Sequence, residues 1–325
     1  MILVTGGTGF VGRHLVNALV RNGKSVRVLV RDPSRSTLLP RETTVIHGDL
    51  GDPHVVAAAV AGARAVVHLA AQMDGSVADE GTMIAANVRA TSELVAAAAD
   101  AGVGHVVYVS SAGVYGSRRT FEPASEADDP RPGTAYERSK LAADEAVRAG
   151  AAPWTVLRPS GVFGPGRDHT AAFLRSVATR RVWFYGGTDT LLNPVYVDDV
   201  VAAIVFSLEQ PTARGEIINV GGPRILSHRE LVDVAAAALG RSAHQVRVPR
   251  LVTRAGAGAF RLACAIARRE VPQHVEEMSW RVVNRAVNTD KARRLGMTST
   301  SLEAAMASTV HQLRAQSGHL PIQTS

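Results

Sequence analysis

Cysteine is almost absent from this sequence, and its scarcity limits the chemistry available. The 325 residues include one cysteine, Cys264, which excludes an internal disulfide and a zinc site built from cysteines. Such a chain is typical of a reducing compartment, so we expect a cytoplasmic protein, and we expect no metal site. No stretch reaches the roughly 20 uninterrupted apolar residues of a membrane-spanning helix, and Met1 leads into an apolar strand-like run without a signal-peptide pattern. We therefore expect no membrane partner.

Lysine is also rare, since only Lys24, Lys140 and Lys291 contribute to the 36 basic residues. Arginine carries the ordinary surface charge, so each lysine is a candidate for a specific role. The net charge of +7 is concentrated in residues 241–325, which hold 13 basic and 5 acidic side chains. A basic region can attract a nucleic acid or an acidic protein, but this one lacks a recognised nucleic-acid motif. We expect no nucleic-acid partner.

Short runs of β-branched residues alternate with longer alanine-rich stretches over the first 110 residues. The expected strands are 2–5, 25–30, 44–47, 65–69 and 105–110, followed later by 154–158 and 216–220. The expected helices include 9–22, 53–61, 87–101, 135–149 and 227–239. This alternation predicts an α/β fold, a Rossmann-type doubly wound parallel sheet with helices on both faces.

The length and a change of pattern after Gly222 predict two unequal domains. We expect one domain built on the parallel sheet over residues 1–165, to which residues 195–221 return. Residues 166–194 and 222–325 are expected to form a smaller, mainly helical domain.

A glycine-rich turn, TGGTGFVG, follows the first strand directly. Gly6, Gly9 and Gly12 have the spacing that lets backbone pass close to a pyrophosphate, while the next helix offers unpaired N–H groups to the phosphates. A strand before and a helix after are the context in which this pattern indicates a dinucleotide site. The candidate cofactor residues in this turn are Thr5, Gly6, Gly9, Phe10, Val11 and Gly12.

The residue after the second strand indicates which dinucleotide binds. A site for NAD usually places an acidic side chain there to accept from the ribose 2′-hydroxyl, whereas this chain has Arg31. A guanidinium can pair with a 2′-phosphate, and Arg35 lies one helical turn further on, so we expect NADP(H) rather than NAD(H). Two alternatives stay open: Arg31 could be a solvated charge, and Asp32 could serve a ribose.

A serine, a tyrosine and a lysine make the strongest chemical pattern. The segment VSSAGVYG ends the fifth strand, and Tyr136 and Lys140 follow in YERSK. Residues four apart share one face of a helix. An ammonium near a phenol favours the phenolate and lowers the pKa of the tyrosine, which makes it a usable proton donor and acceptor. A serine hydroxyl can then polarise the carbonyl that Tyr136 protonates.

The chain resembles the extended short-chain dehydrogenase/reductases, which include the NAD-dependent epimerase/dehydratases and the 3β-hydroxysteroid dehydrogenases. The resemblance covers nearly the whole chain and rests on TGGTGFVG, HGDL, HLAA, Asn87, VSSAGVYG, YERSK, LRPSGVFGPG and VYVDDV, in that order. This motif order is specific for fold and cofactor class and much less so for substrate. It implies an NAD(P)-dependent oxidoreductase whose dinucleotide-binding Rossmann domain is formed by residues 1–165 with 195–221, and whose substrate-binding domain is formed by residues 166–194 and 222–325. It also implies a homodimer packed through the helices 87–101 and 135–149.

The resemblance also implies roles for single residues. Ser111, Tyr136 and Lys140 would form the catalytic triad, and Lys140 would also hold the nicotinamide ribose. Asn87 would join the proton relay or support the nicotinamide. Ser111 is preferred over Ser110 because it lies three residues before the valine of VYG. The remaining candidate cofactor contacts are Asp49, Leu50, Leu69, Ala70, Ala71, Tyr136 and Pro159.

Two departures from the family pattern bear on the substrate. Sugar-nucleotide epimerases usually grip the substrate diphosphate with an asparagine and an arginine, where this chain has Gly161 and Leu192. An unpaired diphosphate is costly to desolvate, which disfavours a sugar nucleotide, although Arg158, Arg167 or Arg224 could substitute.

The sequence of residues 157–166, LRPSGVFGPG, is more similar to the hydroxysteroid dehydrogenase and dihydroflavonol reductase branch than to the sugar-nucleotide epimerases. The candidate substrate contacts are mostly apolar: Met73, Ser111, Val162, Phe163, Trp183, Tyr185 and Leu192. We expect a ketoreductase or alcohol dehydrogenase acting on a hydrophobic ketone or secondary alcohol of polyketide, terpenoid, steroid or flavonoid type. Two alternatives stay open, namely a sugar-nucleotide epimerase, reductase or dehydratase and a non-catalytic NADP(H) sensor.

Overall fold

The computed structural model describes residues 1–72, 80–116, 122–179, 181–185, 190–248, 250–266 and 284–317. Seven strands form one parallel sheet in the order β11-β6-β5-β4-β1-β2-β3. They are β1 Ile2–Thr5, β2 Val26–Val30, β3 Thr44–His47, β4 Ala65–His68, β5 Val106–Val109, β6 Trp154–Pro159 and β11 Ile217–Val220. Each predicted strand is found to within one residue at either end.

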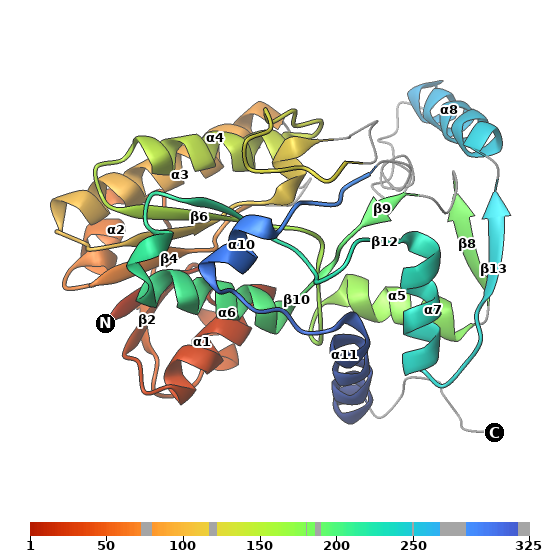
Figure 1. Ribbon diagram of the computed structural model, residues 1–325. Helices are drawn as coiled ribbons and strands as arrows, with labels where there is room; N and C mark the ends of the chain where they lie inside the picture. The colour runs from red at the N-terminus through yellow and green to blue at the C-terminus, as the bar shows by residue number, and fades with distance from the viewer. Residues whose placement is uncertain are drawn as a thin grey trace.

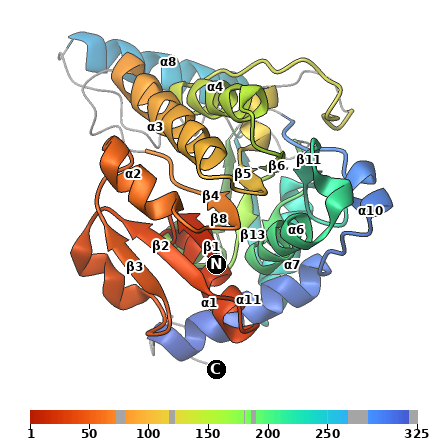
Figure 2. The same cartoon turned by 90° about the vertical axis from the view of Figure 1, so that its left-hand side faces the viewer.

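Helices cover both faces of this sheet, as Figures 1 and 2 show. One face packs against α1 Phe10–Arg21 and α6 Val197–Glu209, and the other against α2 Pro53–Val60, α3 Glu80–Asp100 and α4 Ala135–Ala149. Successive strand residues point to opposite faces, so Val4 packs in the first core and Leu3 in the second. The predicted doubly wound α/β fold is confirmed.

The sequence order of the strands reverses at β1, which has β2 on one side and β4 on the other. Ligands of open α/β sheets bind in the crevice beyond the carboxyl ends of the strands at such a point. The fold therefore places the glycine-rich turn after β1 at the expected position for a cofactor.

The second part of the molecule is built mainly from helices, α5 Asp168–Ala178, α7 His228–Ala238 and α11 Leu302–Ser317, which share an apolar core. Short strands pair beside them: β7 Val162–Phe163 with β10 Val195–Tyr196, β9 Leu191–Leu192 with β12 Leu226–Ser227, and β8 Arg181–Tyr185 with β13 His244–Val248. The remaining elements are α8 Arg250–Ile266, α10 Asp290–Leu295, η1 Pro33–Leu38, η2 Ala112–Tyr115 and η3 Pro211–Ala213. The exact division into two domains stays a prediction.

The start of one helix and the pairing of two strands differ from the sequence-based expectation. Helix α3 begins at Glu80, seven residues before the predicted start, because the alanine-rich pattern gave no signal for its first two turns. The β8–β13 pair joins segments about 60 residues apart, which local periodicity does not reveal. Among the described residues, no helix is long and apolar enough to cross a membrane.

Two histidines are buried beside the sheet in their neutral form. His68 hydrogen-bonds through Nδ1 to the Thr5 hydroxyl at 2.6 Å and through Nε2 to the Thr91 hydroxyl at 3.0 Å. His105 hydrogen-bonds through Nε2 to the Thr155 hydroxyl at 2.9 Å. Burial lowers the pKa of His68 to about 3 and that of His105 to about 4, and the charge of a nearby basic side chain adds to each effect.

We expect the free energy of unfolding to fall as the pH drops below about 6.5, where a histidine in an unfolded chain titrates. Below that pH the two imidazoles bind protons in the unfolded chain but stay neutral in the folded chain, so acid favours unfolding. Each buried histidine contributes a loss of about 2 kcal/mol by pH 5. Urea unfolding at pH 7.5 and pH 5 measures it, and His105→Gln should reduce the loss by about that amount. An undiminished loss in this variant would contradict the role of His105.

Candidate active site

The turn between β1 and α1 forms a cradle that has no room for side chains. Gly6 has a φ of +70°, and a Cβ there would lie 2.6 Å from the Ala70 backbone nitrogen. A Cβ at Gly12 would overlap the Gly6 carbonyl. Helix α1 begins at Phe10 with no capping side chain and no acidic residue in its first turn, so its first N–H groups and the positive end of its dipole are open to an anion. This geometry fits the pyrophosphate of a dinucleotide.

Charged residues after β2 border this cradle. Arg31 is exposed, and Arg35 Nη2 donates to the Thr8 carbonyl in the glycine-rich turn at 3.2 Å. Asp32 instead caps η1, since its Oδ1 accepts from the Ser34 amide at 3.0 Å and from the Ser34 hydroxyl at 2.7 Å. These hydrogen bonds lower the pKa of Asp32. The carboxylate is therefore engaged in its own turn, while Arg35 reaches the cradle.

The other predicted cofactor contacts lie in the segments after β3 and β4 and at the end of β6. Asp49 is exposed, and its Oδ1 accepts from the Gly51 amide at 2.8 Å; Leu50 packs partly against the core. Leu69 donates its amide to the Thr5 carbonyl at 3.1 Å, which keeps the backbone of β4 beside β1. Ala70 and Ala71 are half-buried at this edge, and Pro159 ends β6 in a buried position.

Asn87 of α3 holds the backbone just after Ala71. Its Oδ1 accepts from the Gln72 amide at 2.8 Å, and its Nδ2 donates to the Gln72 carbonyl at 3.1 Å and to the Ser139 hydroxyl at 3.2 Å. Asn87 thus ties the loop after β4 to helix α4. A direct part in a proton relay stays a prediction.

The structure brings Ser111, Tyr136 and Lys140 together. Ser111 caps η2, where its hydroxyl accepts from the Gly113 amide at 3.0 Å, and it lies close enough to Tyr136 to lower the pKa of that phenol. Lys140 lies one turn after Tyr136 on α4, and its Nζ donates to the Val109 carbonyl at 2.7 Å.

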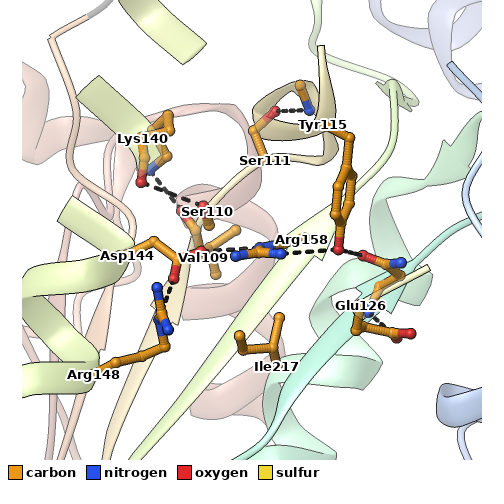
Figure 3. Close-up of polar contacts among 12 residues, drawn as sticks. Val109, Ser110, Ser111, Tyr115, Glu126, Lys140, Asp144, Arg148, Arg158 and Ile217 are labelled. Atoms are coloured by element: carbon orange, nitrogen blue, oxygen red, sulfur yellow. Dashed lines mark hydrogen bonds and ion pairs between the residues drawn. The ribbon is translucent and has the colours of Figure 1, made fainter. Parts of the chain in front are cut away.

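The neighbouring serine points elsewhere. Ser110 is buried, and its hydroxyl donates to the backbone carbonyl of Lys140 at 3.5 Å, as Figure 3 shows. The contact with Tyr136 therefore falls to Ser111, the serine chosen from its position before VYG.

The electrostatics at Tyr136 differ from the expectation that Lys140 lowers the pKa of its phenol. Burial raises this pKa, Arg167 lowers it, the carboxylate of Glu137 raises it again, and the hydrogen bond with Ser111 lowers it. Burial also lowers the pKa of Lys140 to about 7, opposed by Asp144. The expectation of a lowered pKa is wrong, because desolvation outweighs the nearby cations, among which Arg167 lowers the pKa most.

Arg167 lies between the glycine-rich turn and the loop after β6. Its Nη1 donates to the Val162 carbonyl, and its guanidinium carbon lies 5.6 Å from the centre of the Phe10 ring. Arg158 is instead held in a buried ion pair, and Arg224 in an exposed one. Of the three arginines considered for binding a diphosphate, Arg167 is the one that contacts a residue of the glycine-rich turn, Phe10.

The N-terminus of α4 is fixed by a segment from far along the chain. Glu137, 2% exposed, accepts through Oε2 from the Gly133 amide at 2.8 Å and through Oε1 from Arg285 Nη1 at 2.9 Å. The backbone of residues 285–288 also pairs with Ala124. The helix that carries Tyr136 is therefore held by the C-terminal part of the molecule.

The predicted substrate contacts are only partly described. Val162 and Phe163 are half-buried in β7, and Leu192 is half-buried in β9. Met73 lies outside the described residues, and so do the side chains of Trp183 and Tyr185.

Comparison with known protein families identifies the family to which the chain belongs. The NAD dependent epimerase/dehydratase family matches residues 2–221. The chain belongs to this family. The predicted membership of the extended short-chain dehydrogenase/reductases is confirmed, and this enzyme is an NAD(P)-dependent oxidoreductase or epimerase of that kind rather than a non-catalytic sensor. The family binds a nicotinamide cofactor, which the glycine cradle fits.

Relatives and solved structures of different specificity resemble this enzyme. It is 32% identical over 282 residues to "3-beta-hydroxysteroid dehydrogenase" of Mycolicibacterium neoaurum, covering 79% of this chain and 75% of the relative. It is 32% identical over 253 residues to "2-alkyl-3-oxoalkanoate reductase" of Stenotrophomonas maltophilia, covering 74% and 76%. The structure of MoeE5 with UDP-glucuronic acid and NAD matches with a TM-score of 0.75 and 26% identity, over 97% and 99% of the two chains.

Two contributions to the site were missed by sequence reasoning. The action of Arg167 on Tyr136 joins positions 31 apart, and no local pattern signals it. Asp144, which supports the charge of Lys140, continues the spacing of four that links Tyr136 and Lys140. Extending that spacing by one turn would have found it.

We expect Lys140 to titrate near pH 7 in the cofactor-free enzyme, because burial removes water from its ammonium group. Only three lysines are present, so ¹³Cε-lysine NMR resolves each of them, and Lys140→Met identifies the signal. A Lys140 resonance that titrates near 10, as an exposed lysine does, would contradict the described burial.

Proposed function

We propose that this enzyme is a ketoreductase or alcohol dehydrogenase for a hydrophobic ketone or secondary alcohol. The observation that carries the proposal is the placement of Ser111 and Tyr136 near each other and beside the buried Lys140, at the strand ends that also hold the glycine cradle. The apolar side chains of Val162 and Phe163 support an apolar substrate. The names of the hydroxysteroid dehydrogenase and oxoalkanoate reductase relatives point the same way.

The side chains divide the work of ketone reduction between them. When bound, the nicotinamide cofactor supplies or takes up the hydride. Ser111 donates a hydrogen bond to the carbonyl oxygen, and Tyr136 transfers its phenolic proton to the same oxygen. Because burial raises the pKa of Tyr136, the phenol stays protonated at neutral pH, which suits it to act as the acid when a ketone is reduced. The charge of Arg167 then stabilises the phenolate that is left.

Tyr136→Phe should lower kcat about 10³-fold, because the general acid is removed, while the dissociation constant for NADPH changes less than about twofold, because the phosphate cradle is untouched. Turnover is measured by NADPH oxidation with a 3-ketosteroid, a 2-alkyl-3-oxoalkanoate and α-tetralone, and binding by NADPH fluorescence. Near-normal turnover in this variant would refute the assignment of Tyr136.

NADP(H) is proposed as the preferred cofactor. Arg35 reaches the glycine-rich turn, and the carboxylate of Asp32 is occupied in capping η1. Arg31 follows β2 directly and is exposed, so its guanidinium is accessible to a 2′-phosphate.

Arg31→Asp should reduce the preference for NADPH over NADH, measured as the ratio of kcat/KM values, by about 30-fold, because an ion pair becomes a repulsion. The matched control is Arg64→Asp, which makes the same charge change in an exposed residue next to the opposite end of the sheet. An unchanged ratio in Arg31→Asp would mean that Arg31 does not face the 2′-position.

A sugar-nucleotide epimerase, reductase or dehydratase is the second candidate, because Arg167 places a cation beside the site and MoeE5 is a structural neighbour. Thermal-shift screening separates the two candidates. A clear stabilisation by UDP or dTDP with none by the ketones would favour the second.

A homodimer formed through α3 and α4, and a cytoplasmic location, stay predictions.

A further inference from the structure

A buried arginine lies between the segments that supply the triad. Arg158, near the end of β6, is 2% exposed. Its Nε donates to Asp144 Oδ2 at 2.9 Å, and its Nη1 donates to the Tyr115 hydroxyl at 2.9 Å. Figure 3 shows the guanidinium spanning the space from α4 to the segment that carries Tyr115.

Each of these two contacts leads to a member of the triad. Asp144 lies on α4, one turn after Lys140 and two turns after Tyr136. Tyr115 is the last residue of η2, the turn that Ser111 caps. One planar group therefore joins the helix that carries the proton donor to the turn that carries the serine.

The network around Arg158 is satisfied on both sides. The Tyr115 hydroxyl donates to Asn219 Oδ1 on β11 at 2.9 Å. Asp144 is fully buried, and its second oxygen accepts from Arg148 Nε at 2.8 Å. These contacts leave the guanidinium little freedom to rotate, since the ring of Tyr115 also lies 5.1 Å from its carbon.

Stability alone is a poor explanation for this network. The desolvation of a buried ion pair offsets most of its attraction, and apolar side chains of the same volume often stabilise a core as well. What a forked guanidinium provides is a fixed angle and distance between its two partners.

We propose that Arg158 is a positioning residue that sets the placement of Ser111 relative to Tyr136, acting through Tyr115 and Asp144. The inference rests on the proposed function, because it takes Ser111 and Tyr136 as the pair that handles the carbonyl oxygen. A misplacement of about 1 Å at such a pair is enough to lower turnover by about two orders of magnitude.

Asp144 adds an electrostatic contribution at the same point. Its carboxylate raises the pKa of Lys140 against the effect of burial. The ion pair with Arg158 holds that carboxylate beneath Lys140 on the helix, so the position and the charge of α4 depend on the same contact.

The direct substitution Arg158→Ala would leave Asp144 charged in the core, and misfolding would mask its effect on catalysis. Tyr115→Phe is the sharper test, because it removes one hydroxyl and keeps the ring. We expect kcat to fall about tenfold with NADPH and whichever of the 3-ketosteroid, 2-alkyl-3-oxoalkanoate and α-tetralone is turned over fastest, with an unchanged dissociation constant for NADPH.

A double-mutant cycle with Ser111→Ala separates positioning from general weakening of the fold. If Tyr115 acts through Ser111, Tyr115→Phe should lower kcat less than about twofold in the Ser111→Ala background. A tenfold loss in both backgrounds, or no loss in the parent, would overturn the inference. The matched control is Tyr196→Phe, which deletes another buried tyrosine hydroxyl, 3.3 Å from that of Ser308, and should change kcat less than about twofold.

A second measurement does not depend on turnover. The ¹³Cζ resonance of Tyr136, identified with Tyr136→Phe, should shift in Tyr115→Phe and not in Tyr196→Phe, because only the former displaces Ser111, which acts on the phenol of Tyr136. An unmoved resonance would overturn the inference by itself. If Tyr136→Phe keeps its turnover, the proposed function fails; if Tyr136→Phe is inactive and the cycle is additive, only the positioning role fails.

Discussion

A parallel sheet buried on both faces can present polar groups only where its strands end, and the rest of this structure depends on that constraint. The interiors of β1, β4 and β5 are filled by apolar side chains that face one helical layer or the other. Thr5, Ser111 and Pro159 come at or just beyond the carboxyl ends of their strands. The glycine cradle, Ser111 and the segment after β6 are thereby gathered at one edge of the sheet, although none of them are neighbours in the chain.

The fold and the main chemical groups could be predicted because they depend on local pattern. The glycine turn, the strand ends and the helical spacing of Tyr136 and Lys140 each occupy fewer than ten consecutive residues. The orientation of Arg158, the cation at Tyr136 and the clamp on Glu137 could not be predicted, since their partners lie 14 to 148 positions away. The sign of the pKa shift of Tyr136 belongs with these, because it depends on how much water the folded site excludes.

The cations of the site have different surroundings and therefore different uses. Arg158 is locked between an aspartate and a tyrosine, and Lys140 is buried where a proton is held weakly. Arg167 interacts with Tyr136 while lying over the ring of Phe10. The site thus combines one fixed cation, one that can lose its charge near neutral pH, and one able to respond to negative charge on the phenol.

The contacts of residues 285–288 with Glu137 and Ala124 also bear on how the enzyme is made. A ribosome releases the chain from its N-terminus, so the seven strands and α4 emerge well before the segment that clamps the head of α4. The nascent sheet can assemble early, yet the helix that carries Tyr136 gains these contacts only after residues 285–288 have been synthesised. The final placement of Tyr136 therefore follows the synthesis of every strand of the sheet.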